Sequence, residues 1–348
     1  MSISAYIKEI GRGTKGARSL SREQATDLMG QLLDGQLSDL ETGAFCVAMR
    51  FKGESAQELA GFLDATQARL PVWPQATDGR PVVVLPSYNG SRKLPNLIPL
   101  LAALLNRQGM TVLVHGCETE DRRISTGAIW QALQWPVLTA PAALNARQSA
   151  WIQTRHLLPA LERLLQLRRQ MGLRNPGHSL VKLLDPLART SDASTPRSAS
   201  AGSLIVSSYT HPDYAQSMAD TLALCGSSAL LIRGTEGESI AAPQREPATL
   251  GVLRGKTCFV RTALRTPNES ADSDESADQP ERPSAASLTA EQTAQAIRDM
   301  LDGKLPVAEP IQQQVTQITA LYQALAQPSA QSLARLQSFN RAQEVETS

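Results

Sequence analysis

Apolar residues between positions 21 and 68 recur with the period of an amphipathic helix. The stretch SREQATDLMGQLLDG begins at Ser21 with the Ser and Glu/Gln residues that are typical of a helix N-cap, and it ends at Gly35. The segments SDLETGAFCVAMRFKG and ESAQELAGFLDATQARL repeat this arrangement. The pattern predicts three short helices in succession, which we assign to an all-helical N-terminal domain of residues 1–72.

After the proline-containing segment PVWPQATDGRP the apolar residues become continuous, as in buried strands. The strand-like runs VVVLP, TVLVHG, SLIVSSY and SALLIRG alternate with helical patterns. This alternation predicts a mostly parallel central sheet. The predicted fold class is therefore α/β, with a small N-terminal all-helical domain and a larger α/β domain over residues 73–348.

A leucine-rich pattern from 151 to 171 predicts one long amphipathic helix with arginines on its polar side. We expect helices near 155–185 to complete the N-terminal helical domain. The polar stretch RTSDASTPRSASAGS that follows is typical of a loop.

The composition, 42% hydrophobic and 19% charged, is typical of a soluble globular protein. There is no run of eighteen apolar residues, and the segment MSISAYIKEIGRG lacks the apolar core of a signal peptide. We therefore expect a cytoplasmic protein that has no membrane partner. The cysteines lie far apart without a CxxC pair, which favours buried thiols over disulfides or metal ligands. They are Cys46, Cys117, Cys225 and Cys258.

The formal net charge of +1 hides an uneven distribution. A segment near 266–288 contains six acidic residues and one basic residue, and we expect this polar insert to be a disordered loop. The rest of the chain holds 33 Lys and Arg residues against 27 Asp and Glu residues. The folded body is therefore more basic than the net charge suggests.

The basic residues gather near the N-terminus, after two predicted strands, and along the segment 155–189. We predict that they line a continuous groove that holds the phosphates of a nucleic acid, although arginines on an amphipathic helix can also form only its solvated face. The candidate nucleic-acid-binding residues are Lys8, Arg12, Lys15, Arg18, Arg92, Lys93, Arg122, Arg123, Arg168, Arg169, Arg174 and Lys182. Tyr88 is a further candidate for stacking on a base.

The N-terminal stretch LMGQLLDGQLSDLETGAFCVAMRFKGESAQELAGFLDA resembles the helical domain of anthranilate phosphoribosyltransferase and its thymidine phosphorylase relatives. The order of predicted strands and helices also resembles that superfamily, over roughly residues 5–330. The motifs IKEIGRG, PSYNG, GLRN, HSLVKL, HPDY and GTEGE are similar to those of its YbiB-type branch. The resemblance implies a homodimer of two-domain subunits, and for this branch it implies nucleic-acid binding with little sequence preference.

The phosphate loop of the enzymes, GTGGDG, corresponds here to LPSYNG. Three glycines are lost, Pro86 removes an amide donor and Tyr88 adds bulk. Asn96 is kept, but the two hydroxyl residues that follow it in the enzymes are replaced by Ile98 and Pro99. We therefore predict a degenerate phosphate loop. Its residues are Pro86, Ser87, Tyr88, Asn89, Gly90 and Asn96.

Two further motifs of the enzymes are altered. A lysine and an arginine are replaced by Val114 and Glu118, and the Asp-Glu metal pair falls where GTEGES places Glu236 and Glu238 in altered spacing. Four changes at separate elements of one site argue that the transfer chemistry is absent, so we predict no catalytic residues, no cofactor and no metal.

The leading hypothesis is a non-enzymatic protein that holds single- or double-stranded DNA, or RNA, in a basic groove. One alternative is a glycosyltransferase, either a phosphoribosyltransferase or a nucleoside phosphorylase, with an altered substrate. Another is a scaffold whose partner is a second protein. The resemblance places Arg168 in the cleft between the domains, where the enzymes bind their aromatic substrate.

Overall fold

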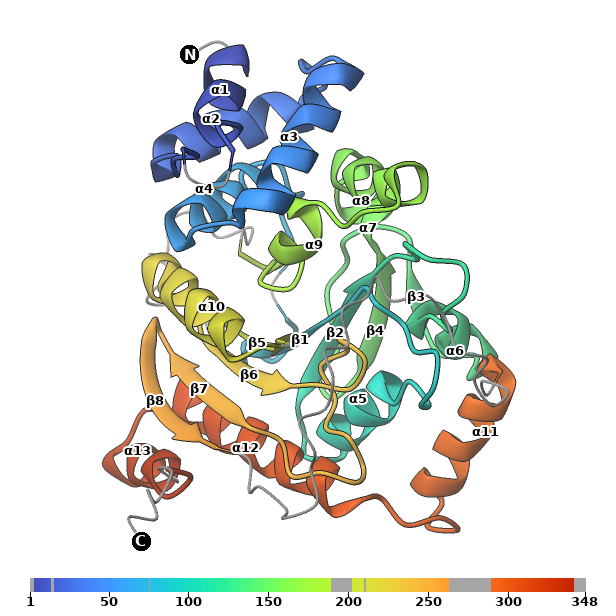
Figure 1. The fold of residues 1–348 in the computed structure, drawn as a ribbon. Helices are drawn as coiled ribbons and strands as arrows, with labels where there is room; N and C mark the ends of the chain where they lie inside the picture. Colours follow the sequence, from blue (N-terminus) through green and yellow to red (C-terminus); the bar gives the residue numbers. More distant parts are fainter. Residues whose placement is uncertain are drawn as a thin grey trace, which may run out of the picture.

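A computed structural model gives the fold of the chain (Figure 1). It describes residues 3–13, 16–74, 76–188, 202–209, 211–262 and 289–340. Lys15 and the acidic insert near 266–288 lie outside these residues, so the expectations for them remain predictions.

The N-terminal domain is a bundle of short helices, as its period predicts. Ser21, Ser38 and Ser55 each cap a helix through a capping box, in which the side chain three residues later binds back to the serine amide. These local signals explain why the helix starts could be predicted. The helices are α1 (Ile3–Ile10), α2 (Arg22–Leu33), α3 (Asp39–Lys52) and α4 (Ala56–Gln67).

Over its described residues, the larger domain contains an eight-stranded sheet with the order β3-β4-β2-β1-β5-β6-β7-β8. The first six strands in this order are parallel, whereas β7 and β8 pair antiparallel at one edge. The predicted fold class, a small helical domain and an α/β domain with a mostly parallel sheet, is confirmed. The strands are β1 (Val82–Ser87), β2 (Thr111–Gly116), β3 (Val137–Leu138), β4 (Ser149–Gln153), β5 (Ser203–Tyr209), β6 (Ala229–Arg233), β7 (Thr249–Leu253) and β8 (Lys256–Arg261).

Alternate residues of the central strands, β4, β2, β1, β5 and β6, enter two different cores. Val82 and Val84 of β1 face the N-terminal helices and α10, whereas Val83 and Leu85 face the helices on the opposite side. Figure 1 shows α10 between the sheet and the helical domain, and α5 and α12 beneath the sheet. Further helices of this domain are α5 (Ile98–Arg107), α6 (Thr126–Ala132), α10 (Pro212–Cys225), α11 (Ala290–Leu301), α12 (Glu309–Ala326) and α13 (Ala330–Gln337).

The single helix predicted over 151–171 is wrong. Trp151 and Ile152 belong to β4, where they pair with β2. The helical part is divided into α7 (Thr154–Leu157) and α8 (Pro159–Met171), because Leu158 adopts an extended backbone before Pro159. The short helix α9 (Pro176–Leu180) follows; it packs against α3 and α4 of the helical domain and also against α8 (Figure 1).

None of the helices in the part of the chain that the structure describes has the length and apolar character needed to span a membrane.

A buried ion pair holds the start of α4. Glu58 is 0% exposed, and its carboxylate accepts hydrogen bonds from the Lys52 ammonium (2.6 Å) and from the backbone amides of Leu20 (2.9 Å) and Ser55 (2.8 Å). The group thus links α3, α4 and the segment that precedes α2.

We expect Glu58→Ala to lower the free energy of unfolding by about 3–5 kcal/mol, because Lys52 would be left as an unpaired charge with little exposure to water. Glu41→Ala is the matched control, since Glu41 occupies the same capping-box position of α3 but is partly exposed, and should cost about 1 kcal/mol. Urea unfolding measures both losses, and equal losses would contradict the role of the buried pair.

Candidate functional site

The candidate site lies at the carboxyl ends of β1, β2 and β6. In parallel sheets, ligands bind at this edge, beside the point where the strand order reverses. Here the order reverses between β1 and β5. Three connections meet at this point: the loop 88–94 after β1, the segment 117–125 after β2, and the turn 234–240 after β6. Ser91 and Ile124 pair as an isolated bridge, which brings the first two together.

The backbone amides of the loop point at a carboxylate of the same chain. Asn89 N and Gly90 N both donate to Glu238 Oε1, at 2.8 and 2.6 Å, and Ser87 Oγ donates to Glu238 Oε2 at 2.6 Å. Glu238 is buried, and burial raises the pKa of its carboxyl, while these hydrogen bonds and Lys182 oppose the rise. Ser87, Asn89 and Gly90 of the degenerate phosphate loop therefore bind a carboxyl group of the same chain.

A second carboxylate is held at the outer end of the same loop. The amides of Arg92, Lys93 and Leu94 all donate to Glu236, with Lys93 N at 2.8 Å and Leu94 N at 3.2 Å. Successive backbone amides that converge in this way form an anion-binding concavity. Arg92 and Lys93 were predicted for their side-chain charges, whereas nothing in the residue pattern indicated that their amides would bind Glu236.

Close packing fixes the turn against the loop. Gly237 has a φ of +85°, and a Cβ atom there would lie 2.4 Å from Asn89 Nδ2. Asn89 Nδ2 donates to the Gly237 carbonyl at 2.6 Å. On the other side, Asn96 Nδ2 donates to Thr126 Oγ1 (2.9 Å), which lies 2.7 Å from Ser87 Oγ. Asn96 thus supports the hydrogen bond from Ser87 to Glu238 through the hydroxyl groups of Thr126 and Ser87.

Tyr88 does not lie where a base could stack on it, so that expectation is wrong. The residue is 5% exposed, its hydroxyl is 2.8 Å from His115 Nδ1, and Thr154 Oγ1 donates to it at 3.1 Å. Burial raises the pKa of Tyr88 and lowers the pKa of His115 to about 3. This neutral pair packs under the loop and supports it.

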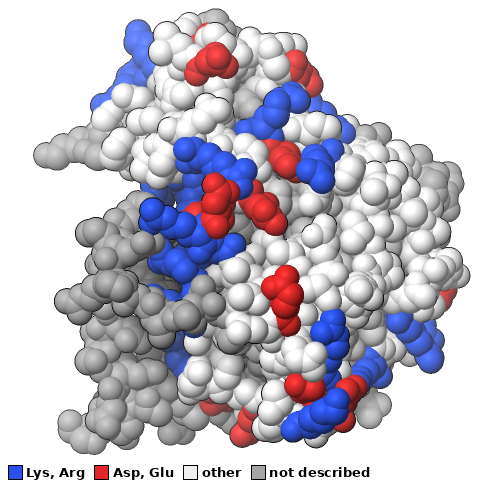
Figure 2. Space-filling view, turned by 90° about the vertical axis from the view of Figure 1, so that its right-hand side faces the viewer, with Lys and Arg blue, Asp and Glu red and all other residues white. Residues whose placement is uncertain are grey.

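Basic side chains gather at the junction of the two domains, with acidic side chains among them (Figure 2). Arg168 binds Glu120 at 2.5 Å, and Arg169 binds Asp121 at the same distance. Arg123 also approaches Glu120, at 3.2 Å. The segment after β2 thus supplies carboxylates to three of the cations predicted for the basic groove, and nucleic-acid binding by these residues stays a prediction.

Two further cations lie deeper in the junction. Arg174 Nη2 donates to Asn89 Oδ1 at 2.9 Å, while its buried Nε has no hydrogen-bond partner among the described residues. Burial, together with the charges of Arg168, Arg123 and Arg50, lowers the pKa of Arg174 to about 10.

Lys182 Nζ donates to the Ser208 carbonyl at 3.1 Å, and burial and Arg174 lower its pKa to about 8. Burial and these neighbouring cations also lower the pKa of His178 to about 3. Arg50, from α3, also acts on Arg174 through its charge, and it was not among the residues predicted for the site.

The N-terminal basic residues that the structure describes are not brought to this junction. They lie on or next to α1, at the end of the helical domain far from the sheet (Figure 1). Arg12 pairs with Glu9 at 2.6 Å. A continuous path from this end to the junction is therefore not seen among the described residues of the group, which are Lys8, Arg12 and Arg18.

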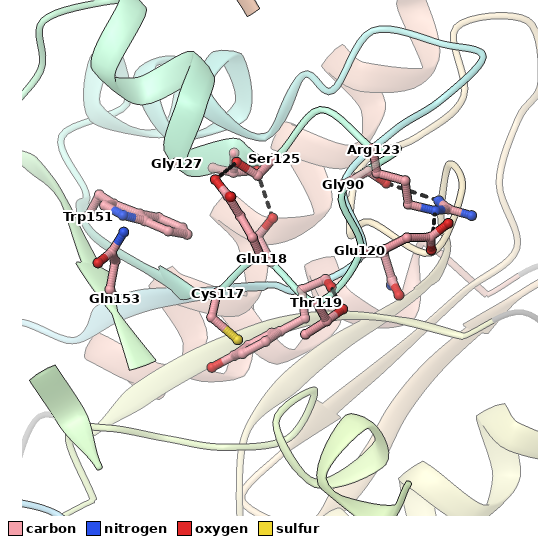
Figure 3. Close-up of a pocket in the computed structure, with 14 residues that line it drawn as sticks. Gly90, Cys117, Glu118, Thr119, Glu120, Arg123, Ser125, Gly127, Trp151 and Gln153 are labelled. Atoms are coloured by element: carbon pink, nitrogen blue, oxygen red, sulfur yellow. Dashed lines mark hydrogen bonds and ion pairs between the residues drawn. The ribbon is translucent and has the colours of Figure 1, made fainter. Parts of the chain in front are cut away.

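A small pocket opens between the loop after β1 and the start of α6 (Figure 3). Tyr88, Cys117 and Trp151 line it together with two acidic residues, Glu118 and Glu120. Glu118 accepts a hydrogen bond from Ser125 Oγ, the N-cap of α6, at 2.6 Å. The carboxylates make this pocket unfavourable for a diphosphate.

Comparisons with known proteins agree with this architecture. Residues 4–69 match the family model "Glycosyl transferase family, helical bundle domain". The chain is 36% identical over 321 residues to the uncharacterized protein YbiB of Escherichia coli (strain K12), which covers 90% of this chain and 92% of YbiB. It is 25% identical over 263 residues to anthranilate phosphoribosyltransferase of Synechococcus sp. (strain JA-3-3Ab), covering 72% of this chain and 70% of that protein.

Solved structures show the same fold. Anthranilate phosphoribosyltransferase from Thermus thermophilus superposes with a TM-score of 0.64 at 20% identity, over 96% of this chain and 94% of that one. The Saccharomyces cerevisiae enzyme in complex with PRPP and Mg has a TM-score of 0.61 at 15% identity, over 97% and 93%.

The helical bundle and the parallel sheet thus define a protein of the anthranilate phosphoribosyltransferase-like superfamily. Within it, the chain belongs to the family of E. coli YbiB. The superfamily resemblance inferred from the sequence is confirmed, whereas nucleic-acid binding by this branch stays a prediction.

The residues of this chain do not fit the diphosphate and metal held by the yeast enzyme. The amides of Asn89, Gly90 and residues 92–94 already bind carboxylates. Within the described residues, no three His, Cys, Asp or Glu side chains are grouped to hold a metal ion. The donor set of the loop is therefore matched to the chain's own glutamates and not to a diphosphate.

We expect Tyr88→Phe to lower the free energy of unfolding by about 1–3 kcal/mol, because His115 Nδ1 and Thr154 Oγ1 would be left buried without their partner. Tyr214→Phe is the control, since this tyrosine is half exposed and should tolerate the change. Thermal and urea unfolding test the difference. If the two variants are equally stable, the buried pair does not support the loop.

Proposed function

We propose that the protein binds nucleic acid through the cations at the domain junction, with little sequence preference. The observation that carries the proposal is that Arg174 and Lys182, both partly buried, donate among the described residues to neutral oxygens, those of Asn89 and Ser208. Each of the two cations has its pKa lowered by burial and by neighbouring cations. Glu120 acts in the opposite sense on Arg174, and Glu238 acts in the opposite sense on Lys182. We infer that the grouped cations still attract phosphate groups.

The position of these charges favours a polymer over a small diphosphate. The amides that could wrap a compact diphosphate are engaged by Glu236 and Glu238, while the cations extend from Arg174 outward to exposed Arg122 and Arg169. A chain of phosphates can follow such a series, and each phosphate that is neutralised releases a counterion. None of these contacts reads a base, so we expect little discrimination between sequences.

The acidic partners set the strength of this binding. Arg168 and Arg169 would have to exchange Glu120 and Asp121 for phosphate oxygens. The affinity then gains only the difference in free energy between the arginine–phosphate contacts and the arginine–carboxylate contacts that they replace. We therefore expect modest binding at physiological salt. The cytoplasmic location remains a prediction from the sequence.

The glycosyltransferase alternative is supported by the fold alone. It predicts that phosphoribosyl diphosphate and magnesium raise the melting temperature of the wild-type protein by mass action. The proposed function predicts no such rise, because the loop amides are engaged.

We also propose a homodimer formed through α3. Leu40 (84% exposed), Val47 and Phe51 (74% exposed) lie on one side of this helix, at spacings of seven and four residues. Exposed apolar residues that form a stripe of this kind are typical of a surface that another molecule covers. A second copy of the chain is the partner implied by the family.

We expect Arg168→Ala combined with Arg169→Ala to weaken binding of a labelled single-stranded oligonucleotide by at least about tenfold at low salt, and to reduce the salt slope by about 0.7 for each lost phosphate contact. Fluorescence anisotropy between low and high salt measures both quantities. The proposal fails if the wild-type protein binds weakly with a flat salt slope, or if the double variant is unchanged.

The matched control is Lys304→Ala combined with Arg335→Ala. It removes the same net charge from the region of α11 and α13, far from the junction (Figure 1). We expect the affinity of this variant to stay within about twofold of wild type. An equal loss in both double variants would indicate attraction by net charge alone.

We expect the wild-type protein to be a dimer, and Leu40→Glu combined with Phe51→Glu to make it a monomer, because the added carboxylates would be buried without partners. Light scattering after size-exclusion chromatography gives the mass of each. Leu333→Glu on α13, also partly exposed, should leave the dimer intact. A monomeric wild type, or a dimeric double variant, would refute the α3 interface.

A further inference from the structure

The loop 88–94 turns five backbone donors toward two carboxylates. Two of the donors, from Asn89 and Gly90, meet the inner carboxylate of Glu238, and three, from Arg92, Lys93 and Leu94, meet the outer carboxylate of Glu236. Unpaired, these donors would form two adjacent oxyanion sites. Both are filled by residues of one turn, two positions apart in the sequence.

The geometry of the turn is specific to this contact. Glu236 adopts a φ of +51° and Gly237 a φ of +85°, so that two successive residues are in the left-handed region. The strain of a non-glycine residue there persists only where the surroundings fix it. Here Glu236 is fixed by three amides and lies 3.8 Å from the Arg123 guanidinium.

The inner contact is also surrounded by groups that favour an anion. Ser87 Oγ donates to Glu238, and Lys182 lies close enough for its charge to oppose the effect of burial on this carboxyl. Arg123 Nη1 donates to the carbonyls of Gly90 and Glu236, at 3.2 and 3.4 Å, and so holds the loop and the turn together. The donors are therefore preorganised, and they do not depend on the glutamates alone for their direction.

We propose that the loop 88–94 is a complete oxyanion site to which the chain supplies its own ligand, and that removing either carboxylate opens it to inorganic phosphate or pyrophosphate. The wild-type chain excludes these ions because Glu236 and Glu238, tethered to the sheet through β6, are present at high effective concentration. This inference concerns the loop alone and does not require that the protein binds nucleic acid.

The test compares wild type, Glu238→Ala and Glu236→Ala, each titrated with sodium pyrophosphate and, separately, sodium orthophosphate. Sodium chloride at the same ionic strength corrects for screening. We expect both variants to melt at a lower temperature than wild type and to be restabilised by the added ion, with binding at least about tenfold tighter than that of wild type by calorimetry. The Glu236 variant keeps the assay usable if loss of the more buried Glu238 prevents folding.

Glu58→Ala is the matched control. Glu58 is another buried carboxylate that binds two backbone amides, but these amides come from separate segments and the group packs inside the helical bundle. Neither phosphate ion should restabilise this variant. Equal restabilisation of Glu58→Ala, or no gain in binding by either loop variant, would overturn the proposal.

NMR shifts of the backbone amide signals on addition of phosphate show where the ion binds. In Glu236→Ala, phosphate should shift the amide signals of Arg92, Lys93 and Leu94 more than those of the α9 region. Larger shifts around Arg174 and Lys182 instead would place the ion at the junction cations and overturn the assignment to the loop. A protein that fails to bind oligonucleotide but shows the loop shifts would contradict only the proposed function.

Discussion

The hydrogen bonds from the Asn89 and Gly90 amides to the Glu238 carboxylate are the constraint on which the rest of the site depends. They join the loop after β1 to the turn after β6, across 148 residues for Gly90. With the Asn89 backbone fixed in this way, its side chain can donate to the Gly237 carbonyl and accept from Arg174. The buried carboxylate thus helps to hold the loop and, through Asn89, the position of Arg174 between α8 and α9.

A carboxylate of the same chain differs from a bound diphosphate in its charge and in being covalently attached. It brings one negative charge instead of several, and it cannot dissociate from the chain. The glycines of a phosphate loop allow amides to wrap a ligand that arrives from solvent, whereas here Pro86 and Tyr88 can replace them because the partner is always present. The buried pair of Tyr88 and His115 then fills the space below the loop with neutral groups.

Local signals made the helical domain and the order of strands predictable. Each N-cap serine lies three residues from the partner that completes its capping box, so the information is contained in one short segment. Contacts between distant segments were not accessible in this way. Arg168 meets Glu120 across 48 residues, and the hydrophobic pattern that predicted one helix over 151–171 could not show that Trp151 pairs with β2. The glutamates of GTEGES were noticed, but their partners were backbone amides, which no residue type reveals.

Among the described residues, the glutamates that bind the loop amides leave some cations at the junction without a hydrogen bond to a carboxylate. Glu238 and Glu236 compensate amide dipoles, and the acidic residues after β2 compensate Arg168 and Arg169 at the surface. Arg174 donates to the neutral oxygen of Asn89, and its Nε has no hydrogen-bond partner in the described part of the chain. Positive potential is thereby concentrated beside a loop that can no longer wrap a compact anion. The proposed ligand presents its phosphates one at a time along the junction, which is a property of a polynucleotide backbone and not of a sugar diphosphate.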